Sequence, residues 1–249
     1  MLSTVNTYEN IYFTTDVIQF PTAKKKRTNS SLKSNGVPKA TAADPIRSID
    51  EVHAMQQYFI DNDEVRNYTM FTLGISFALR AGDLLGLKFD DVFTTSGNVR
   101  SKIVLYEDKT SKRNVIAVNK RCKAVLEAYL QYSFEKLGIK FGMSWKSWPL
   151  FYGRQKAADG TPKAISIQML NQILKRAAAD CGIDGHISSH SMRKTFVYQM
   201  IQAHQGDQNT LLLLQHMLNH SDVRTTFRYC GIEEEEIAVL REEMGGLLI

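Results

Sequence analysis

The chain has 249 residues, of which 43% are hydrophobic, 10% aromatic and 23% charged, and this ordinary composition excludes wholesale disorder. The net charge of +5 lies mostly at the front, because residues 1–48 carry seven basic side chains against three acidic ones. Such an excess fits a polyanionic partner such as nucleic acid, and it equally fits a solvated, disordered arm.

Residues 23–45 show no hydrophobic periodicity and are rich in Lys, Ser, Asn, Thr and Pro, which predicts a flexible arm or linker. Regular structure is expected from Ser48, because Ser48 and Glu51 have the spacing of a capping box. The helix behind this box should reach about residue 61 and bury an apolar stripe made of Ile49, Val52, Met55 and Phe59. We therefore divide the chain into a basic, largely flexible arm over residues 1–47 and a folded domain over residues 48–249.

A second helix is predicted within residues 63–80, opened by Asp63 as its cap and ending near Arg80. The residues that should face inward from it are Val65, Tyr68, Leu73 and Ile75. From residue 99 to residue 118 the pattern changes, since β-branched segments lie on both sides of the polar stretch "EDKTSKR". This pattern predicts a hairpin with Lys109 at or near its turn.

Helical spacing returns in residues 123–138, which Gly138 can end, and in residues 166–182, between a Ser166 cap and Gly182. Residues 147–162 between them should be mostly loop. Further helices are expected over residues 189–204, 207–220, 222–231 and 233–244. The predicted fold class is mainly α with one small antiparallel β-sheet.

Several other kinds of site are excluded by the sequence. It contains no internal repeat, glycine-rich phosphate loop, HExxH motif or paired CxxC motif. Cys122, Cys181 and Cys230 are odd in number and widely spaced, which does not suit a disulfide framework or a zinc site. No signal-like segment and no apolar run of roughly 18 residues is present, so we expect a protein of the reducing cytoplasm that is neither exported nor embedded.

Several basic residues attract attention, and each also has an ordinary interpretation. In "HSMRKTF", His190 and Arg193 are three apart, so on a helix both side chains leave one face and could grip one anion. The same spacing also occurs on solvated helix faces. Arg80 could simply pair with Asp83 at the surface, and Lys109 in its polar turn could serve only solubility.

Four motifs follow one another along the chain: "ALRAGDLLGLKFDDV", "EDKTSKRNVIAV", "HSMRKTF" and "MLNHSDVRTTFRY". In this order they resemble the first arginine box, the lysine hairpin, the HxxR box and the final histidine and tyrosine box of the tyrosine recombinase, or phage integrase, family. The resemblance spans residues 48–240 and implies the catalytic-domain fold of that family. The catalytic residues that it implies are Arg80, Lys109, His190, Arg193, His220 and Tyr229.

The resemblance also implies a role for each of these residues. Tyr229 would attack a DNA phosphodiester and form a 3′-phosphotyrosyl link, and Lys109 would act as the general acid for the leaving 5′ hydroxyl. Arg80, Arg193, His190 and His220 would activate the phosphate, whose growing negative charge suits guanidinium forks. A tyrosine pKa of about 10 leaves little phenolate at neutral pH, so Tyr229 needs this positive charge. No metal and no cofactor is implied.

Two positions depart from the family pattern. Asn219 stands where the family usually has glycine before its last histidine, and asparagine is the next most tolerant residue for a left-handed turn. Asp83 stands where the first box commonly has glutamate. The 47 residues at the front are also fewer than the helical core-binding domain of family members, so the chain is either a fragment or similar to short fimbrial-switch recombinases.

The partners that the resemblance implies are double-stranded DNA and further copies of the chain. Residues 23–39 could follow the phosphate backbone, and the helix over residues 233–244 could join protomers into a tetramer on DNA, or instead close its own domain. Two alternatives remain open: a type IB topoisomerase-like enzyme that relaxes DNA, and a non-catalytic DNA-binding regulator with the same fold. In each case we expect a protein of the cytoplasm, associated with the nucleoid.

Overall fold

The structure is a computed structural model that describes residues 42–137, 144–204, 207–219 and 241–242. Its helices are α2 (Ile49–Asp61), α3 (Val65–Phe77), α4 (Ala81–Gly86), α5 (Phe89–Val92), α6 (Lys120–Leu137), the 3₁₀ helix η1 (Ser144–Ser147), α7 (Ile167–Asp180), α8 (Ser189–Ala203) and α9 (Gln208–Met217). Its strands are β1 (Lys102–Tyr106), β2 (Arg113–Ala117), β3 (Tyr152–Lys156) and β4 (Pro162–Ala164). The predicted mainly helical fold is confirmed, with two small sheets where one was expected.

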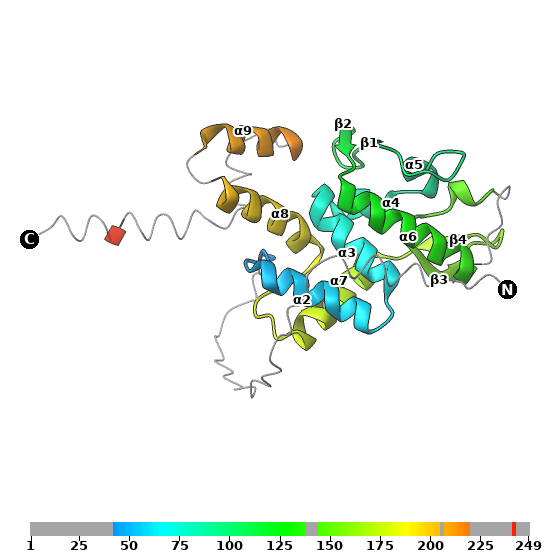
Figure 1. Cartoon of the computed structure of the whole chain (residues 1–249), viewed down its shortest axis with the longest axis horizontal. Coiled ribbons are helices and arrows are strands. Elements are labelled where there is room, and N and C mark those ends of the chain that lie inside the picture. Colours follow the sequence, from blue (N-terminus) through cyan, green and yellow to red (C-terminus); the bar gives the residue numbers. More distant parts are fainter. Residues whose placement is uncertain (1–41, 138–143, 205–206, 220–240, 243–249) are drawn as a thin grey trace, which may run out of the picture.

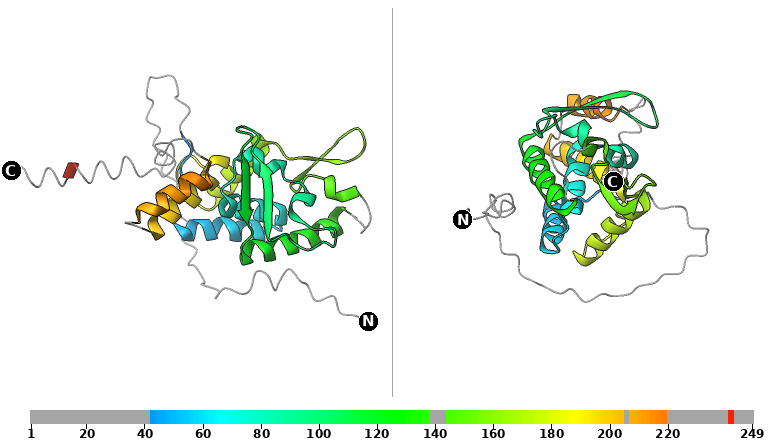
Figure 2. Two further views of the ribbon diagram at one scale, coloured as in Figure 1. Left: turned by 90° about the horizontal axis from the view of Figure 1, so that it is seen from above. Right: turned by 90° about the vertical axis from the view of Figure 1, so that its right-hand side faces the viewer.

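The predicted hairpin is the pair β1–β2, which is antiparallel from Lys102 opposite Ala117 to Tyr106 opposite Arg113. One face of this pair carries Ile103 and Ile116, both buried against the domain. Figure 2 shows the two strands side by side, with the chain turning back between them. The turn between β1 and β2 contains Lys109, as predicted.

The second sheet, β3–β4, was not expected. Residues 147–162 are mostly loop, as predicted, but strand β3 and the first residue of β4 lie within them. The register of this sheet is irregular between Tyr152 and Lys156, and Gly160 has a φ of +81° in the turn. The sequence "YGRQK" of β3 has neither β-branched residues nor an alternation of polar and apolar side chains. An irregular, mostly exposed pair of short strands therefore leaves no periodic signal in the sequence.

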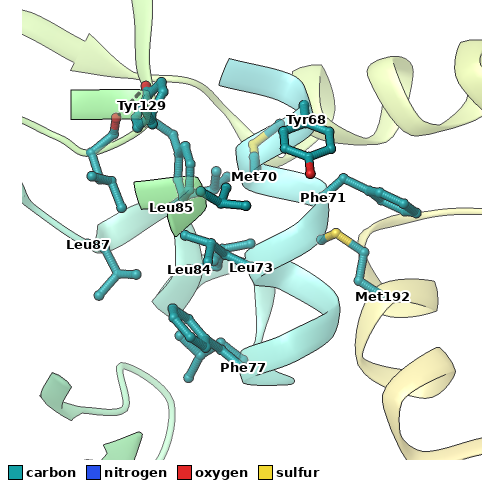
Figure 3. Close-up of a cluster of buried hydrophobic side chains, with 14 of the residues drawn as sticks. Tyr68, Met70, Phe71, Leu73, Phe77, Leu84, Leu85, Leu87, Tyr129 and Met192 are labelled. Atoms are coloured by element: carbon teal, nitrogen blue, oxygen red, sulfur yellow. Dashed lines mark hydrogen bonds between the residues drawn. The ribbon is translucent and has the colours of Figure 1, made fainter. Parts of the chain in front are cut away.

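Helix α3 lies in the centre of the domain and packs on α2, α6 and α8 (Figures 1 and 3). Met70, Phe71 and Leu73 are buried on it, because the surrounding helices cover the helix on several sides. Gly74 allows α8 to approach, since a Cβ at this position would collide with the side chain of Met192. Each large apolar side chain buried here contributes about 1.5–3 kcal/mol to the stability of the fold.

The ends of α3 differ from the prediction. Asp63 is not its cap: Asp63 has a φ of +53°, and the residue before the helix is Glu64, whose side chain makes no capping bond. The helix ends at Phe77 because Ala78 is left-handed, with a φ of 48°. Arg80 is thus not at the end of this helix but caps the start of α4 with an extended backbone. The break between α3 and α4 turns the chain at the point where Arg80 emerges.

Other helix ends follow local signals closely. Ser48 caps α2 as predicted, but its hydroxyl accepts from the N–H of Asp50 and not from that of Glu51, as a capping box would require. Ile49, expected to face inward, is 51% exposed on the first turn. Ser166 caps α7 through the N–H of Met169 at 3.1 Å, and Gly182 has the expected positive φ beyond the end of that helix. The predictions of a Gly138 stop and of helices beyond residue 219 concern residues outside those that the structure describes, apart from residues 241–242.

The chain ahead of α2 already packs on the domain. Ile46 is buried, and its N–H donates to the Thr195 hydroxyl on α8 at 2.8 Å. Helices α8 and α9 lie next to each other (Figure 2), joined by a small cluster of Ala78, Val197, Leu214 and Leu218. Among the described helices, none combines the length and the apolar character that crossing a membrane would need.

Candidate active site

The candidate site begins at the break between α3 and α4. Arg80 is mostly buried, with 21% of its side chain exposed, and it pairs with Glu107, which follows strand β1. The carboxylate of Asp83 lies 4.0 Å from the same guanidinium nitrogen of Arg80. The pairing with Asp83 that sequence alone suggested therefore exists, but the shorter contact is with Glu107, 27 residues further along the chain.

The turn that carries Lys109 is fixed to this point. The N–H of Asp108 donates to Asp83 at 2.8 Å, and the Thr110 hydroxyl donates to Glu107 at 2.6 Å. The N–H of Ser111 closes the turn on the carbonyl of Glu107 at 2.7 Å. Asp83 and Glu107 thus each contact both Arg80 and the turn that carries Lys109.

Arg193 lies inside the protein, where 1% of the residue is exposed. Its two terminal nitrogens donate to the carbonyl oxygens of Ala78 and Leu218, each at 2.7 Å. Ala78 precedes Arg80 by two residues, and Leu218 precedes His220 by two. Arg193 therefore ties helix α8 to the segments that carry two other predicted site residues.

His190 is an exposed residue on the first turn of α8, a turn whose other residues are buried. Its pKa is lowered, first by desolvation of the ring and then by the positive charges of Arg193, Lys194, Lys109 and Arg80. These charges come from the helix itself, from the β1–β2 turn and from the α3–α4 break. Four of the six predicted catalytic residues, Arg80, Lys109, His190 and Arg193, thus belong to one electrostatic cluster.

Asn219 brings the chain to this cluster just before His220. Its φ of 53° confirms the predicted left-handed turn after α9. Its side-chain amide donates to Glu107 at 3.0 Å, and its carbonyl accepts from the Lys112 ammonium at 3.4 Å. His220 and Tyr229 themselves lie outside the described residues.

Residues 48–236 match the family described as "Phage integrase family". The chain belongs to the phage integrase family. It is therefore a tyrosine-type recombinase or integrase, a class of enzymes that act on DNA. One similar protein is the "Probable integrase/recombinase YoeC" of Bacillus subtilis (strain 168), with 30% identity over 203 residues, 82% of this chain and 97% of the relative.

Solved structures share the fold of this integrase-family chain. XerH recombinase bound to its palindromic difH substrate matches with a TM-score of 0.58 at 15% identity, over 80% of this chain and 52% of XerH. A lambda integrase tetramer bound to a Holliday junction matches with a TM-score of 0.51 at 16% identity, over 77% and 49%. The chain also spans only 50% to 66% of the XerC and XerD recombinases that it matches.

The residue of this integrase-family site that the sequence did not reveal is Glu107. Burial raises the pKa of its carboxyl, but hydrogen bonds from Thr110, Asn219 and Arg80, together with the charge of Arg80, outweigh burial and lower the pKa to about 2. The available signal was a pair of acidic residues, Glu107 and Asp108, at the start of an otherwise basic turn. That signal is weak, because only the folded chain shows that the neighbours of Glu107 include Arg80 and Asn219.

Proposed function

We propose that this chain is a site-specific DNA recombinase that cuts and rejoins strands through a 3′-phosphotyrosyl intermediate on Tyr229. The observation that carries the proposal is the electrostatic cluster of Arg80, Lys109, His190 and Arg193, which come from three separate parts of the chain. A scissile phosphate gains negative charge during attack, and positioned cations stabilise that charge most when they are fixed before the reaction. Cutting followed by resealing needs no external energy source, because the phosphotyrosyl bond preserves the energy of the phosphodiester.

Each described residue has a part in this chemistry. Arg80, with its side chain partly exposed, is suited to bind a non-bridging oxygen, and the exposed His190 at the start of α8 is suited to donate to another. Lys109 in the β1–β2 turn acts as the general acid that protonates the departing 5′ hydroxyl. Arg193 supplies positive charge from below the surface and holds the carbonyls of Ala78 and Leu218 in place.

His220 and Tyr229 complete the proposal from outside the described residues. The side chain and the carbonyl of Asn219 both bind residues of the β1–β2 turn, and this supports a place beside the cluster for His220, the next residue. Tyr229 follows nine residues later and requires nearby positive charge to become a nucleophile. No cofactor or metal has a part in the proposed reaction.

We assign residues 48–249 to the catalytic domain and propose that residues 23–39 of the basic arm follow the DNA backbone. The last residues of the arm instead pack on the domain, since Ile46 is buried and its N–H donates to Thr195. The partners are double-stranded DNA and further copies of the chain, joined into a tetramer by residues 233–244. The enzyme would work where its DNA lies, in the cytoplasm at the nucleoid. Removal of residues 233–249 should weaken assembly on DNA, measured by light scattering of the complex, and undiminished assembly would contradict this role.

The test uses a nicked suicide duplex built on inverted repeats that are first mapped in the DNA flanking the gene. The intact chain should form an SDS-resistant adduct with this duplex, and Tyr229→Phe should form none. Tyr58→Phe is a matched control, since the Tyr58 hydroxyl binds Asp180 at 2.8 Å between α2 and α7, away from the cluster. Binding without an adduct would point to a regulator, and relaxation of a supercoiled plasmid without exchange between two sites would point to a topoisomerase.

A further inference from the structure

The carboxylate of Glu107 joins the separate parts of the candidate site. Its side chain is completely buried, and it accepts hydrogen bonds from four side chains. These are Arg80, Thr110 at 2.6 Å, Asn114 at 3.2 Å and Asn219 at 3.0 Å. One charged group thus contacts the first arginine, both sides of the lysine turn and the residue before His220.

A buried charge with this many donors is strongly fixed. Removing a carboxylate from water costs several kcal/mol, and the cost is recovered only when hydrogen bonds and an opposite charge surround it. Since the pKa of Glu107 is about 2, the group stays ionised at every pH at which DNA strand transfer is assayed. Its four donors are therefore held in one arrangement, because any other arrangement would leave part of a buried charge unpaired.

The contact with Arg80 orients a residue that the proposed reaction needs. A guanidinium has five N–H donors in one plane, so an ion pair at one nitrogen restrains the position of the group and still leaves donors for a phosphate. Glu107 cannot move away to compete for that phosphate's position, because its other oxygen is bound to Asn114 and Asn219. Glu107 therefore orients Arg80 and does not compete with the phosphate for it.

Asn219 connects the same carboxylate to the last part of the site. The left-handed turn at this residue would also suit glycine, which adopts a positive φ without strain. A glycine would keep the turn but would lack the amide that donates to Glu107. The asparagine therefore both tolerates the backbone and ties the chain ahead of His220 to the β1–β2 turn.

We propose that Glu107 is a positioning residue that holds Arg80, the turn of Lys109 and the chain before His220 in their reactive arrangement. Glu107 holds the chain before His220 through the side chain of Asn219. The proposal rests on the proposed recombinase function. It assigns Glu107 no contact with the DNA.

The decisive variant is Glu107→Gln, which keeps the volume of the side chain and removes its charge. Adduct formation on the nicked suicide duplex should slow by about 100-fold, the size of effect seen when one positioned donor in an active site is lost. Binding of the same duplex should change by less than about threefold, since Glu107 does not touch DNA and three-fold corresponds to under 1 kcal/mol. Glu127→Gln, at a 53%-exposed position on α6, is the matched control and should react like the unaltered chain.

Asn219→Gly tests the link while it preserves the left-handed turn. The rate of adduct formation should fall by about tenfold, the effect of one hydrogen bond to a charged group. Combined with Glu107→Gln, the substitution should cause little additional loss, because its acceptor is already altered. An Asn219→Gly rate equal to that of the unaltered chain, or fully multiplied losses in the double variant, would overturn the link.

A measurement without DNA separates this proposal from the proposed function. Phenylglyoxal modifies arginine, and peptide mass spectrometry can follow Arg80 against the exposed Arg154 as an internal reference. Modification of Arg80 should be several-fold faster in Glu107→Gln, because the ion pair that restrains the guanidinium is weakened. This should hold even if the unaltered chain forms no adduct, a result that would refute the recombinase function alone. Unchanged Arg80 modification, or an unchanged or faster adduct rate in Glu107→Gln, would overturn the positioning role.

Discussion

Replacing Arg193 with lysine should lower the stability of the whole domain. Arg193 is buried and binds two carbonyl oxygens, those of Ala78 and Leu218, each at 2.7 Å. A lysine has one nitrogen on a flexible stem, so it cannot reproduce the two bonds that separate nitrogens of the guanidinium make to these carbonyls. A hydrogen bond to a charged group contributes about 1.5–3 kcal/mol, so Arg193→Lys should reduce the free energy of unfolding by about 2–3 kcal/mol.

The assay is equilibrium unfolding in urea, with thermal unfolding as a second measure. For a domain of this size 1 kcal/mol corresponds to a melting shift of about 2–4 °C, so the melting temperature should fall by about 4–12 °C. Arg176→Lys is the control, because Arg176 is 48% exposed and pairs with Glu64 at the surface, where such pairs contribute about 0–1 kcal/mol. If Arg193→Lys unfolds within about 0.5 kcal/mol of the unaltered chain, the assigned role of these two bonds is wrong.

Three further experiments test the cap of α7, the electrostatics of His190 and the general acid. Ser166→Ala should cost about 1 kcal/mol in urea unfolding, because it removes the cap bond to the N–H of Met169, and no loss would contradict this cap. By NMR, the His190 ring should titrate below its ordinary pKa of 6.5, and acidification through 6.5 should therefore lower the stability of the fold, because the unfolded chain takes up the proton first. Binding to duplex DNA should raise the pKa of His190. Titration at or above 6.5 in the free protein would contradict the effect of the nearby cations. The Lys109→Ala variant should form far less adduct, and a substrate with a 5′-thiol leaving group, which departs without an acid, should restore adduct formation. The Lys112→Ala variant should be affected far less. The reverse order would assign the general acid to Lys112.

Much of the fold follows from local signals in the sequence. The caps at Ser48 and Ser166, the β1–β2 hairpin and the left-handed Asn219 depend on residues close to one another in the chain, and sequence patterns record such interactions directly. The order of the basic residues also identified the family. Local chemistry was misleading at Asp63, which has the right residue type for a cap but a positive φ instead.

The rest depends on contacts between distant segments. Helix α3 stops at Ala78, a non-glycine residue in a left-handed conformation, and the carbonyl of Ala78 accepts a bond from Arg193, 115 residues later. Similarly, Glu107 looks like one more polar residue of a turn until folding places Asn219, 112 residues away, beside it. No pattern along the chain records such pairs, because each partner is ordinary in its own segment.

The central claim is that Arg80, Lys109 and His190 converge on a single phosphate within reach of Tyr229. The most direct test is an experimental structure of the Tyr229→Phe chain bound to the duplex on which the unaltered chain forms its adduct. We expect one backbone phosphate with non-bridging oxygens within about 3.2 Å of donors on Arg80 and His190, and with the ring of the substituted residue facing its phosphorus. A complex in which these residues contact different phosphates, or in which position 229 faces away from the one they share, would contradict the account.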